Sequence, residues 1–173
     1  MTSTDVPTSG SGGQFEPPWT HRSPVPAAML NPSVVAVILG RSAFGFARES
    51  RSDMPWALSF VVAPLVLHRG TRAALPSRVS THLPAWVSRE PAVRAGFPLR
   101  AASLVGPVRA GLRFGLRHDM LSLNGALLGA TQMRPPADEP ELVELMTKAT
   151  FVGRWLSKLE RPSTAFALFG VSV

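Results

Sequence analysis

The chain has 173 residues, a length that fits one domain with little room for a second core. It contains no cysteine, which excludes disulfides, thiolate metal sites and a cysteine nucleophile. The formal net charge is +7, and nine arginines against one glutamate lie in residues 69–117, so the basic character belongs to one stretch.

Two features of the sequence bear on location. The longest apolar run, Met54 to Leu67, is interrupted by two prolines and is shorter than the roughly 20 residues that a spanning helix needs. The first residues have no basic segment followed by an apolar one, as a signal peptide would. We therefore expect a cytoplasmic protein that does not enter a membrane.

The first 30 residues are rich in serine, threonine, glycine and proline. Such a segment buries too little apolar surface to offset the entropy lost on ordering. We predict a disordered N-terminal tail over residues 1–30 and a single domain over residues 31–173.

The first predicted helices are strongly apolar. Asn31 can cap a helix with Pro32 at its first position, and the pattern extends this helix to about residue 49. It is apolar on most sides, which indicates a central place in the core. A second helix is predicted over residues 55–67, with a kink or restart at Pro64 because proline lacks the amide hydrogen.

The middle of the chain predicts four further helices. A short one covers residues 71–75, and apolar residues at helical spacing indicate another over 82–89. The next would run from 92 to 105. The pair Gly106-Pro107 predicts a break, after which a separate helix covers 107–118.

The last third predicts a hairpin and two helices. Asn124-Gly125 between apolar residues predicts a β-hairpin over 121–128 with a type I′ turn, in which both central residues have positive φ. Residues 138–141 resemble a capping box at the start of a helix that extends to about 159. A final helix is predicted over 164–169.

These elements define the expected fold class, which is mainly α with one β-hairpin. Three helices followed by a two-stranded wing are typical of a winged-helix domain. In that arrangement the basic helix directly before the hairpin holds the recognition position, where it would contact nucleic acid.

A search for catalytic groupings finds little. The chain has no phosphate-binding loop, no zinc-protease motif and no nucleophile elbow, and none of its four histidines lies three to five residues from another. His118-Asp119 is the one suggestive pair, as an acid–base dyad or as a histidine at a helix C-terminus, and we favour the second interpretation. We expect no enzyme activity, no cofactor, no metal and no small-molecule substrate.

Two groups of residues are candidates for contact with partners. Arg109, Arg113 and Arg117 form a stripe at four-residue spacing that could bind DNA phosphates or an acidic protein, or could be a solvated helix face. Trp86, Phe151 and Trp155 could anchor an interface, because tryptophan is enriched at binding hot spots. For the two tryptophans, which lie in amphipathic segments, we favour core or half-buried packing over an interface.

A series of packing and turn motifs, in this order, resembles the middle component family of three-component ABC systems over about residues 30–171. The motifs are Asn31-Pro32, Ala63-Pro64-Leu65-Val66-Leu67-His68-Arg69-Gly70-Thr71-Arg72-Ala73-Ala74-Leu75-Pro76, Leu83-Pro84-Ala85-Trp86-Val87, Phe114-Gly115-Leu116-Arg117-His118, Phe151-Val152-Gly153-Arg154-Trp155-Leu156 and Phe166-Ala167-Leu168-Phe169-Gly170-Val171.

The resemblance implies a non-catalytic adaptor. Its expected partners are an ABC ATPase subunit of the chromosome-structuring type and a third, effector component, and DNA contact would come through the ATPase complex. The family's systems are thought to act against invading phage or plasmid DNA. The alternative function is a free-standing winged-helix DNA-binding transcriptional regulator.

Overall fold

The computed structural model describes residues 30–171. The predicted N-terminal tail, apart from Leu30, lies outside these residues. In chain order the elements are α2 (Pro32–Ser50), β1 (Met54–Pro55), the 3-10 helix η2 (Trp56–Leu58), α3 (Ser59–Leu67), α4 (Arg69–Ala74), α5 (Leu83–Arg89), α6 (Pro91–Arg117), β2 (Leu121–Asn124), β3 (Leu127–Ala130), α7 (Pro140–Leu156) and α8 (Pro162–Phe169).

Helix α2 begins as its sequence predicts. The side chain of Asn31 accepts a hydrogen bond from the Ser33 amide over 3.0 Å, and Pro32 occupies the first turn. The helix ends at Ser50, one residue beyond the predicted end, and Arg51 follows in the left-handed region with φ of 60°. Local capping signals therefore set both ends of this helix.

Helix α3 is buried on all sides. Every residue from Ser59 to Leu67 except Phe60 is buried, as expected for a helix without a polar face. The predicted helix from Pro55 is wrong, because the segment opens with a strand and a 3-10 turn. Of the kink or restart predicted at Pro64, the restart is excluded, because one helix runs through this residue.

The small sheet has one strand more than predicted. Its order is β1-β3-β2, all antiparallel, and Met54 of β1 pairs with Leu128 of β3. Pro55 lies in β1 at the sheet edge, where a missing amide is tolerated. Thus the predicted hairpin exists, and a segment about 70 residues earlier in the chain completes it.

The hairpin turn differs from the predicted type. Asn124 pairs with Leu127, so the two turn residues are Gly125 and Ala126. Only Gly125 has a positive φ, of 60°, whereas a type I′ turn needs two such residues. A glycine at the first central position is typical of the type II′ turn. The Asn-Gly pair therefore predicted the hairpin correctly but placed its turn one residue too early.

Helix α6 differs more from its prediction than the other elements do. It is one continuous helix of 27 residues, with Pro98 and Pro107 inside it, where two helices and a break at Gly106-Pro107 were predicted. An internal proline costs about 3 kcal/mol. Against this, α6 buries several apolar side chains along its length, of which the valines, the phenylalanine and the leucine each contribute about 1.5–3 kcal/mol. They are Val93, Phe97, Ala101, Val108 and Leu112.

Helix α7 begins differently from its prediction. Glu139 is the N-cap and makes no capping side-chain hydrogen bond, and Pro140 occupies the first helical position. The predicted capping box would need the N-cap one residue earlier, at Asp138, so that hypothesis is wrong. The helix also ends at Leu156 rather than at about 159. The final helix, α8, ends at Phe169, and Gly170 follows it with a φ of 66°.

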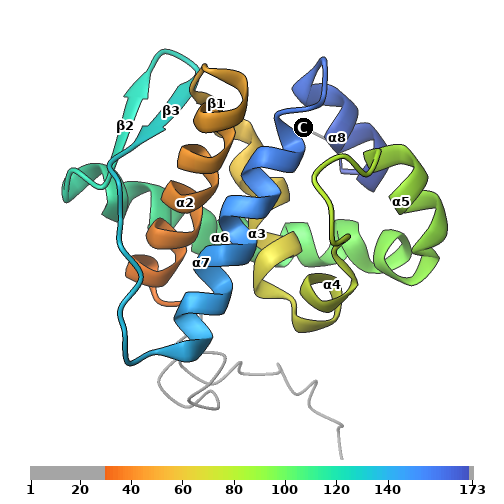
Figure 1. The fold of residues 1–173 in the computed structure, drawn as a ribbon, viewed down its shortest axis with the longest axis horizontal. Helices are drawn as coiled ribbons and strands as arrows, with labels where there is room; N and C mark the ends of the chain where they lie inside the picture. The colour runs from red at the N-terminus through yellow and green to blue at the C-terminus, as the bar shows by residue number, and fades with distance from the viewer. Residues whose placement is uncertain (1–29, 172–173) are drawn as a thin grey trace, which may run out of the picture.

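The helices surround one hydrophobic core (Figure 1). Helix α2 lies between the sheet and α7, α6 crosses behind α2 and α3, and α4, α5 and α8 lie on the side opposite the sheet. Among residues 30–171 the protein is thus mainly helical with a small antiparallel sheet. No helix in this part of the chain combines the length and the hydropathy needed to cross a membrane.

Candidate interaction surface

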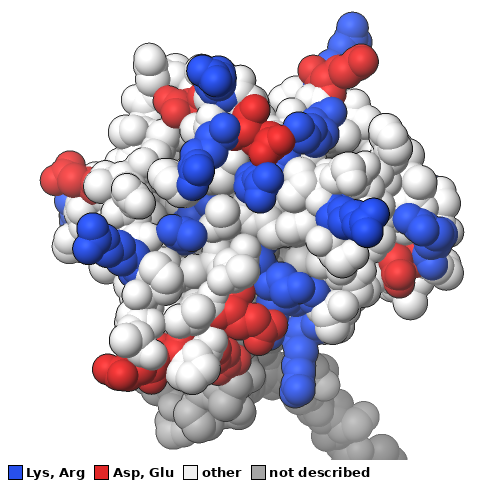
Figure 2. Space-filling view, viewed as in Figure 1, with Lys and Arg blue, Asp and Glu red and all other residues white. Residues whose placement is uncertain are grey.

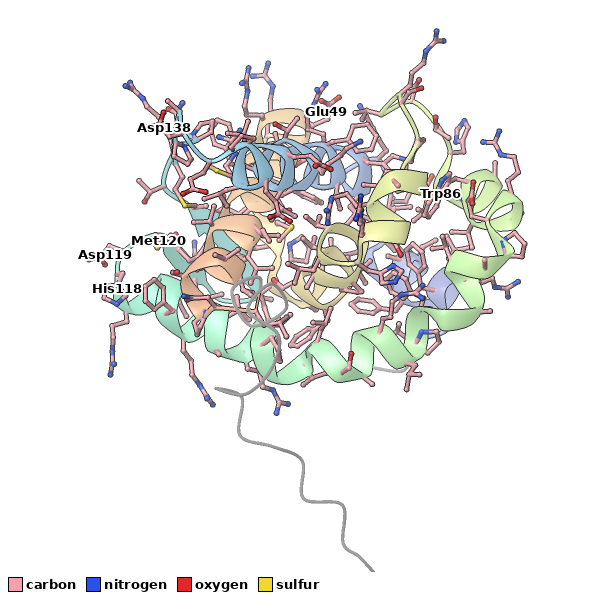
Figure 3. All side chains as sticks on the ribbon, turned by 90° about the horizontal axis from the view of Figure 1, so that it is seen from below. Glu49, Trp86, His118, Asp119, Met120 and Asp138 are labelled. Atoms are coloured by element: carbon pink, nitrogen blue, oxygen red, sulfur yellow. The ribbon has the colours of Figure 1, made fainter. Side chains whose placement is uncertain are left out.

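The arginine stripe lies on the outer face of α6. Arg109, Arg113 and Arg117 are all exposed, whereas the opposite face of the helix is buried against α2 and α3. Figure 3 shows long nitrogen-tipped side chains extending from α6 away from the molecule. None of the ion pairs within residues 30–171 includes these three arginines. Their guanidinium groups are therefore directed toward solvent.

An apolar cavity of about 500 Å³ lies beside this stripe. Its wall includes Trp56 and Phe60 from η2 and α3, Val105 from α6 and Phe166 from α8, and Arg109 is also part of its lining. The Trp56 ring packs edge-on against Phe60, with centroids 5.9 Å apart, and is still 40% exposed. The cavity could not be predicted from the sequence, because its walls come from three segments that are far apart in the chain.

The two predicted tryptophan anchors lie in the core instead of at the surface. Trp86 and Trp155 are 3% and 2% exposed and pack edge-to-face with ring centroids 5.1 Å apart. Their indole N–H groups donate to the carbonyls of Ala74 over 2.8 Å and Thr81 over 2.6 Å. These side chains hold the segment between α4 and α5 against the core. The favoured core interpretation therefore describes both tryptophans, and the interface interpretation is corrected, since neither presents a surface to a partner.

Phe151, the third predicted interface residue, is half-buried on α7. Its ring lies 6.1 Å from that of Trp155, centroid to centroid. It borders the core and keeps part of its ring at the surface. Phe151 is thus the member of the predicted trio that a partner could reach.

His118 and Asp119 lie at the end of α6 (Figure 3). The His118 amide donates to the Phe114 carbonyl over 3.1 Å, and its ring packs on the Phe114 ring with centroids 4.3 Å apart. Asp119 has a φ of 54°, and its carbonyl accepts from the Thr131 hydroxyl over 2.9 Å. No hydrogen bond between these two side chains occurs among the described residues. The pair terminates the helix rather than forming a hydrogen-bonded dyad.

Acidic and basic side chains are mixed on the opposite face of the molecule, where α2 and α7 lie (Figure 2). Glu49 of α2 pairs with Lys158 over 2.6 Å and with Arg154 over 3.0 Å. These hydrogen bonds, first from Lys158 and then from Arg154, lower the pKa of the Glu49 carboxyl below its usual 4.5. Glu49, Arg154 and Lys158 on this face are therefore paired with one another, whereas Arg109, Arg113 and Arg117 of α6 take part in no ion pair among the described residues.

Near the start of α4 lies a small cluster of cationic and imidazole groups. The Nδ1 atom of His68 accepts a hydrogen bond from the Thr71 amide over 3.1 Å. Burial and the positive charges of Arg100 and Arg72 lower the pKa of His68 below 6.5. Arg72 is buried and donates to the Val66 carbonyl over 2.8 Å. Within the described residues, no three histidine, aspartate or glutamate side chains gather as a metal ion would require.

Comparison with known proteins identifies the family. The family model described as ABC-three component (ABC-3C) system Middle Component 3 matches residues 19–173. This match begins within the predicted tail, earlier than the resemblance noted in the sequence, which starts at about residue 30. No curated protein and no solved structure matches the chain. Because the match covers most of the chain, the protein belongs to the Middle Component 3 family of ABC-three component systems.

Proposed function

We propose that this protein is a non-catalytic adaptor that links an ABC ATPase of the chromosome-structuring type to an effector component. The observation that carries the proposal is the family match over residues 19–173, because a middle component works together with other components of its system. We further propose that residues 31–173 act as one unit in the cytoplasm. The system would act against phage or plasmid DNA, which the adaptor would meet through the ATPase complex.

The surface of the described residues supports this role. A row of exposed arginines and an open apolar cavity both lie along α6, which gives a partner protein charged and apolar contacts on one helix. On the α2 and α7 face, Glu49, Arg154 and Lys158 are already paired with one another. We therefore place the docking surface on α6.

Co-expression with the neighbouring genes tests the adaptor proposal. The full-length tagged protein should retain an ABC ATPase subunit and a third component through size-exclusion chromatography. Each pair of the three components should also be co-expressed alone. The adaptor should bind the ATPase and the third component separately, whereas these two should associate only in its presence. Elution of the tagged protein without either component would refute the proposal.

A winged-helix DNA-binding regulator is the second candidate. The observation that favours it is the position of the exposed Arg109, Arg113 and Arg117 on the helix directly before β2, where a recognition helix would precede its wing. This candidate requires a dimer that binds half-sites one helical turn apart in its own promoter. Footprinting of that promoter by the purified protein would separate it from the adaptor.

A further inference from the structure

The cavity beside α6 has the properties of a docking site for an apolar group. Its volume of about 500 Å³ is within the range of about 300–1,000 Å³ that binding pockets cover. The lining is mostly apolar, and the exposed Trp56 and Ala102 lie at its opening to solvent. Covering such apolar surface with an apolar partner group removes it from water and is favourable.

The cavity is continuous with the arginine stripe. Arg109 belongs to the cavity lining, and Arg113 and Arg117 follow it at intervals of four residues on the same helix. This spacing corresponds to about 6 Å along α6. Between Pro91 and Arg117 the helix carries five arginines and no acidic residue. A ligand seated in the cavity and extending along α6 would therefore meet only positive charge.

We propose that the occupant is an acidic amphipathic helix of a partner protein. Its bulky apolar side chain would fill the cavity, and its carboxylates, spaced four residues apart, would pair with Arg109, Arg113 and Arg117. Two parallel or antiparallel helices share the same rise per turn, so the two rows of opposite charge match in spacing. This inference rests on the proposed adaptor function and names the chemistry of its partner.

Other kinds of ligand would use either the arginines or the cavity, but not both. Double-stranded DNA would satisfy the arginines, but it presents phosphates rather than a projecting apolar group that could enter the cavity. A small apolar molecule would fill the cavity and leave Arg113 and Arg117 without a role. A protein helix with an apolar anchor and acidic neighbours uses both features.

Paired variants in the full-length chain test the inference. Ala102→Arg places a charge at the cavity opening, and Ser103→Arg adds the same charge at an exposed neighbour that does not line the cavity. Arg109→Glu reverses a stripe charge, and Arg134→Glu makes the same change in an exposed loop. We expect Ala102→Arg and Arg109→Glu each to weaken binding of the ATPase or the effector at least tenfold. The controls Ser103→Arg and Arg134→Glu should bind as the wild type does.

A photo-crosslinking amino acid at Val105 then identifies the occupant in the assembled complex. The expected product joins Val105 to a partner segment in which a bulky apolar residue and acidic residues share one helical face. Crosslinking to residues 1–29 of this chain, or to a second copy of it, would overturn the inference. So would wild-type partner binding by a folded Ala102→Arg protein, which would leave the adaptor function intact. If the wild type retains neither component, both proposals fail.

Discussion

At the scale of single residues, two glycines determine how closely α2 and α7 approach. A Cβ atom at Gly45 would overlap the Thr150 carbonyl oxygen, and one at Gly153 would overlap the Ser42 carbonyl oxygen. Beside them, the buried Ser42 hydroxyl donates to the Ala149 carbonyl over 2.9 Å. The contact is between two backbones, so no side-chain rotation could relieve it.

Replacing Gly153 by alanine should therefore destabilise the fold. Forcing an extra carbon into a packed core costs about 1–3 kcal/mol, more than the up to about 1 kcal/mol gained from alanine's helix propensity. The matched control is Gly106→Ala in α6, where the added carbon has no neighbour within 4 Å. Urea titration should show lower stability for the first variant and a gain of about 0.5–1 kcal/mol for the second.

His68 makes stability depend on pH. Its folded-state pKa is lowered by burial and by the charges of Arg100 and Arg72, so the unfolded chain binds its proton more readily. Stability should therefore fall as pH decreases from 6.5 through the lower folded-state pKa. Protonation of Nδ1 also removes the acceptor for the Thr71 amide.

The variant His68→Asn isolates this effect. Asparagine can accept the Thr71 hydrogen bond without titrating. Thermal unfolding between pH 7.5 and 5 should show a smaller decrease in stability with falling pH for the variant than for the wild type. Equal pH dependence in both proteins would assign the effect to other groups.

At the scale of elements, α6 shows how burial outweighs local preference. Two prolines interrupt its backbone hydrogen bonding, yet the helix is continuous because its apolar face packs against α2 and α3. Close approach at Gly111 and Gly115, where a Cβ would collide with Val35 and Leu121, keeps α6 in contact with α2 and β2. The stripe and the cavity share one helix only because this continuity is maintained.

Replacing Pro107 by alanine should stabilise the protein. The change restores an amide donor and removes a steric clash, which should raise the free energy of unfolding by about 3 kcal/mol. The unfolded chain also becomes more flexible without the proline, which lowers that free energy by about 1 kcal/mol. We expect a net gain of about 2 kcal/mol by denaturant titration. Pro91→Ala is the control, because proline is well suited to the first helical position and its loss should bring no gain.

At the scale of the whole molecule, charge is unevenly distributed. The start of α7 carries exposed acids, namely Asp138, Glu139, Glu141 and Glu144, whereas α6 carries only arginines among its charged residues. The acids gather where the loop after β3 enters α7 (Figure 2). A partner approaching α6 thus meets a positive field, which accelerates its association and orients it.

Reversing Arg109, Arg113 and Arg117 to glutamate should distinguish the two candidate functions. For the adaptor, the triple variant should associate more slowly with its partner, and the difference should shrink as salt is added. For the DNA-binding regulator, the triple variant should lose promoter binding, whereas wild-type binding should show a salt slope of about one for each arginine that contacts a phosphate. Unchanged binding to both ligands would show that the stripe contacts neither.

Much of the local structure could be predicted because it depends on neighbours along the chain. The Asn31 cap, the apolar spacing of α5 and α7 and the hairpin signal at Gly125 all act within a few residues. The stripe of Arg109, Arg113 and Arg117 was also visible, since helical spacing alone places three arginines on one face. The motif order of the chain was enough to identify the family.

Apart from local details such as the hairpin turn type and the N-cap of α7, the predictions that failed concern contacts between distant parts of the chain. Nothing local indicated that Met54 would pair with Leu128 or that Trp86 and Trp155 would pack together. Spacing within one segment cannot tell whether an apolar face meets a partner protein or the rest of its own chain. The apolar faces that carry Trp86 and Trp155 pack against other parts of the same chain.

By itself, the sequence determined the helical class, the hairpin, the concentration of positive charge between residues 69 and 117 and the family. Only the tertiary structure decided that α6 is continuous, that a third strand joins the sheet and that a cavity opens next to Arg109. The physical reason is the range of the forces involved. Capping and periodicity act over a few residues, whereas burial is a sum over side chains that only the folded chain brings together.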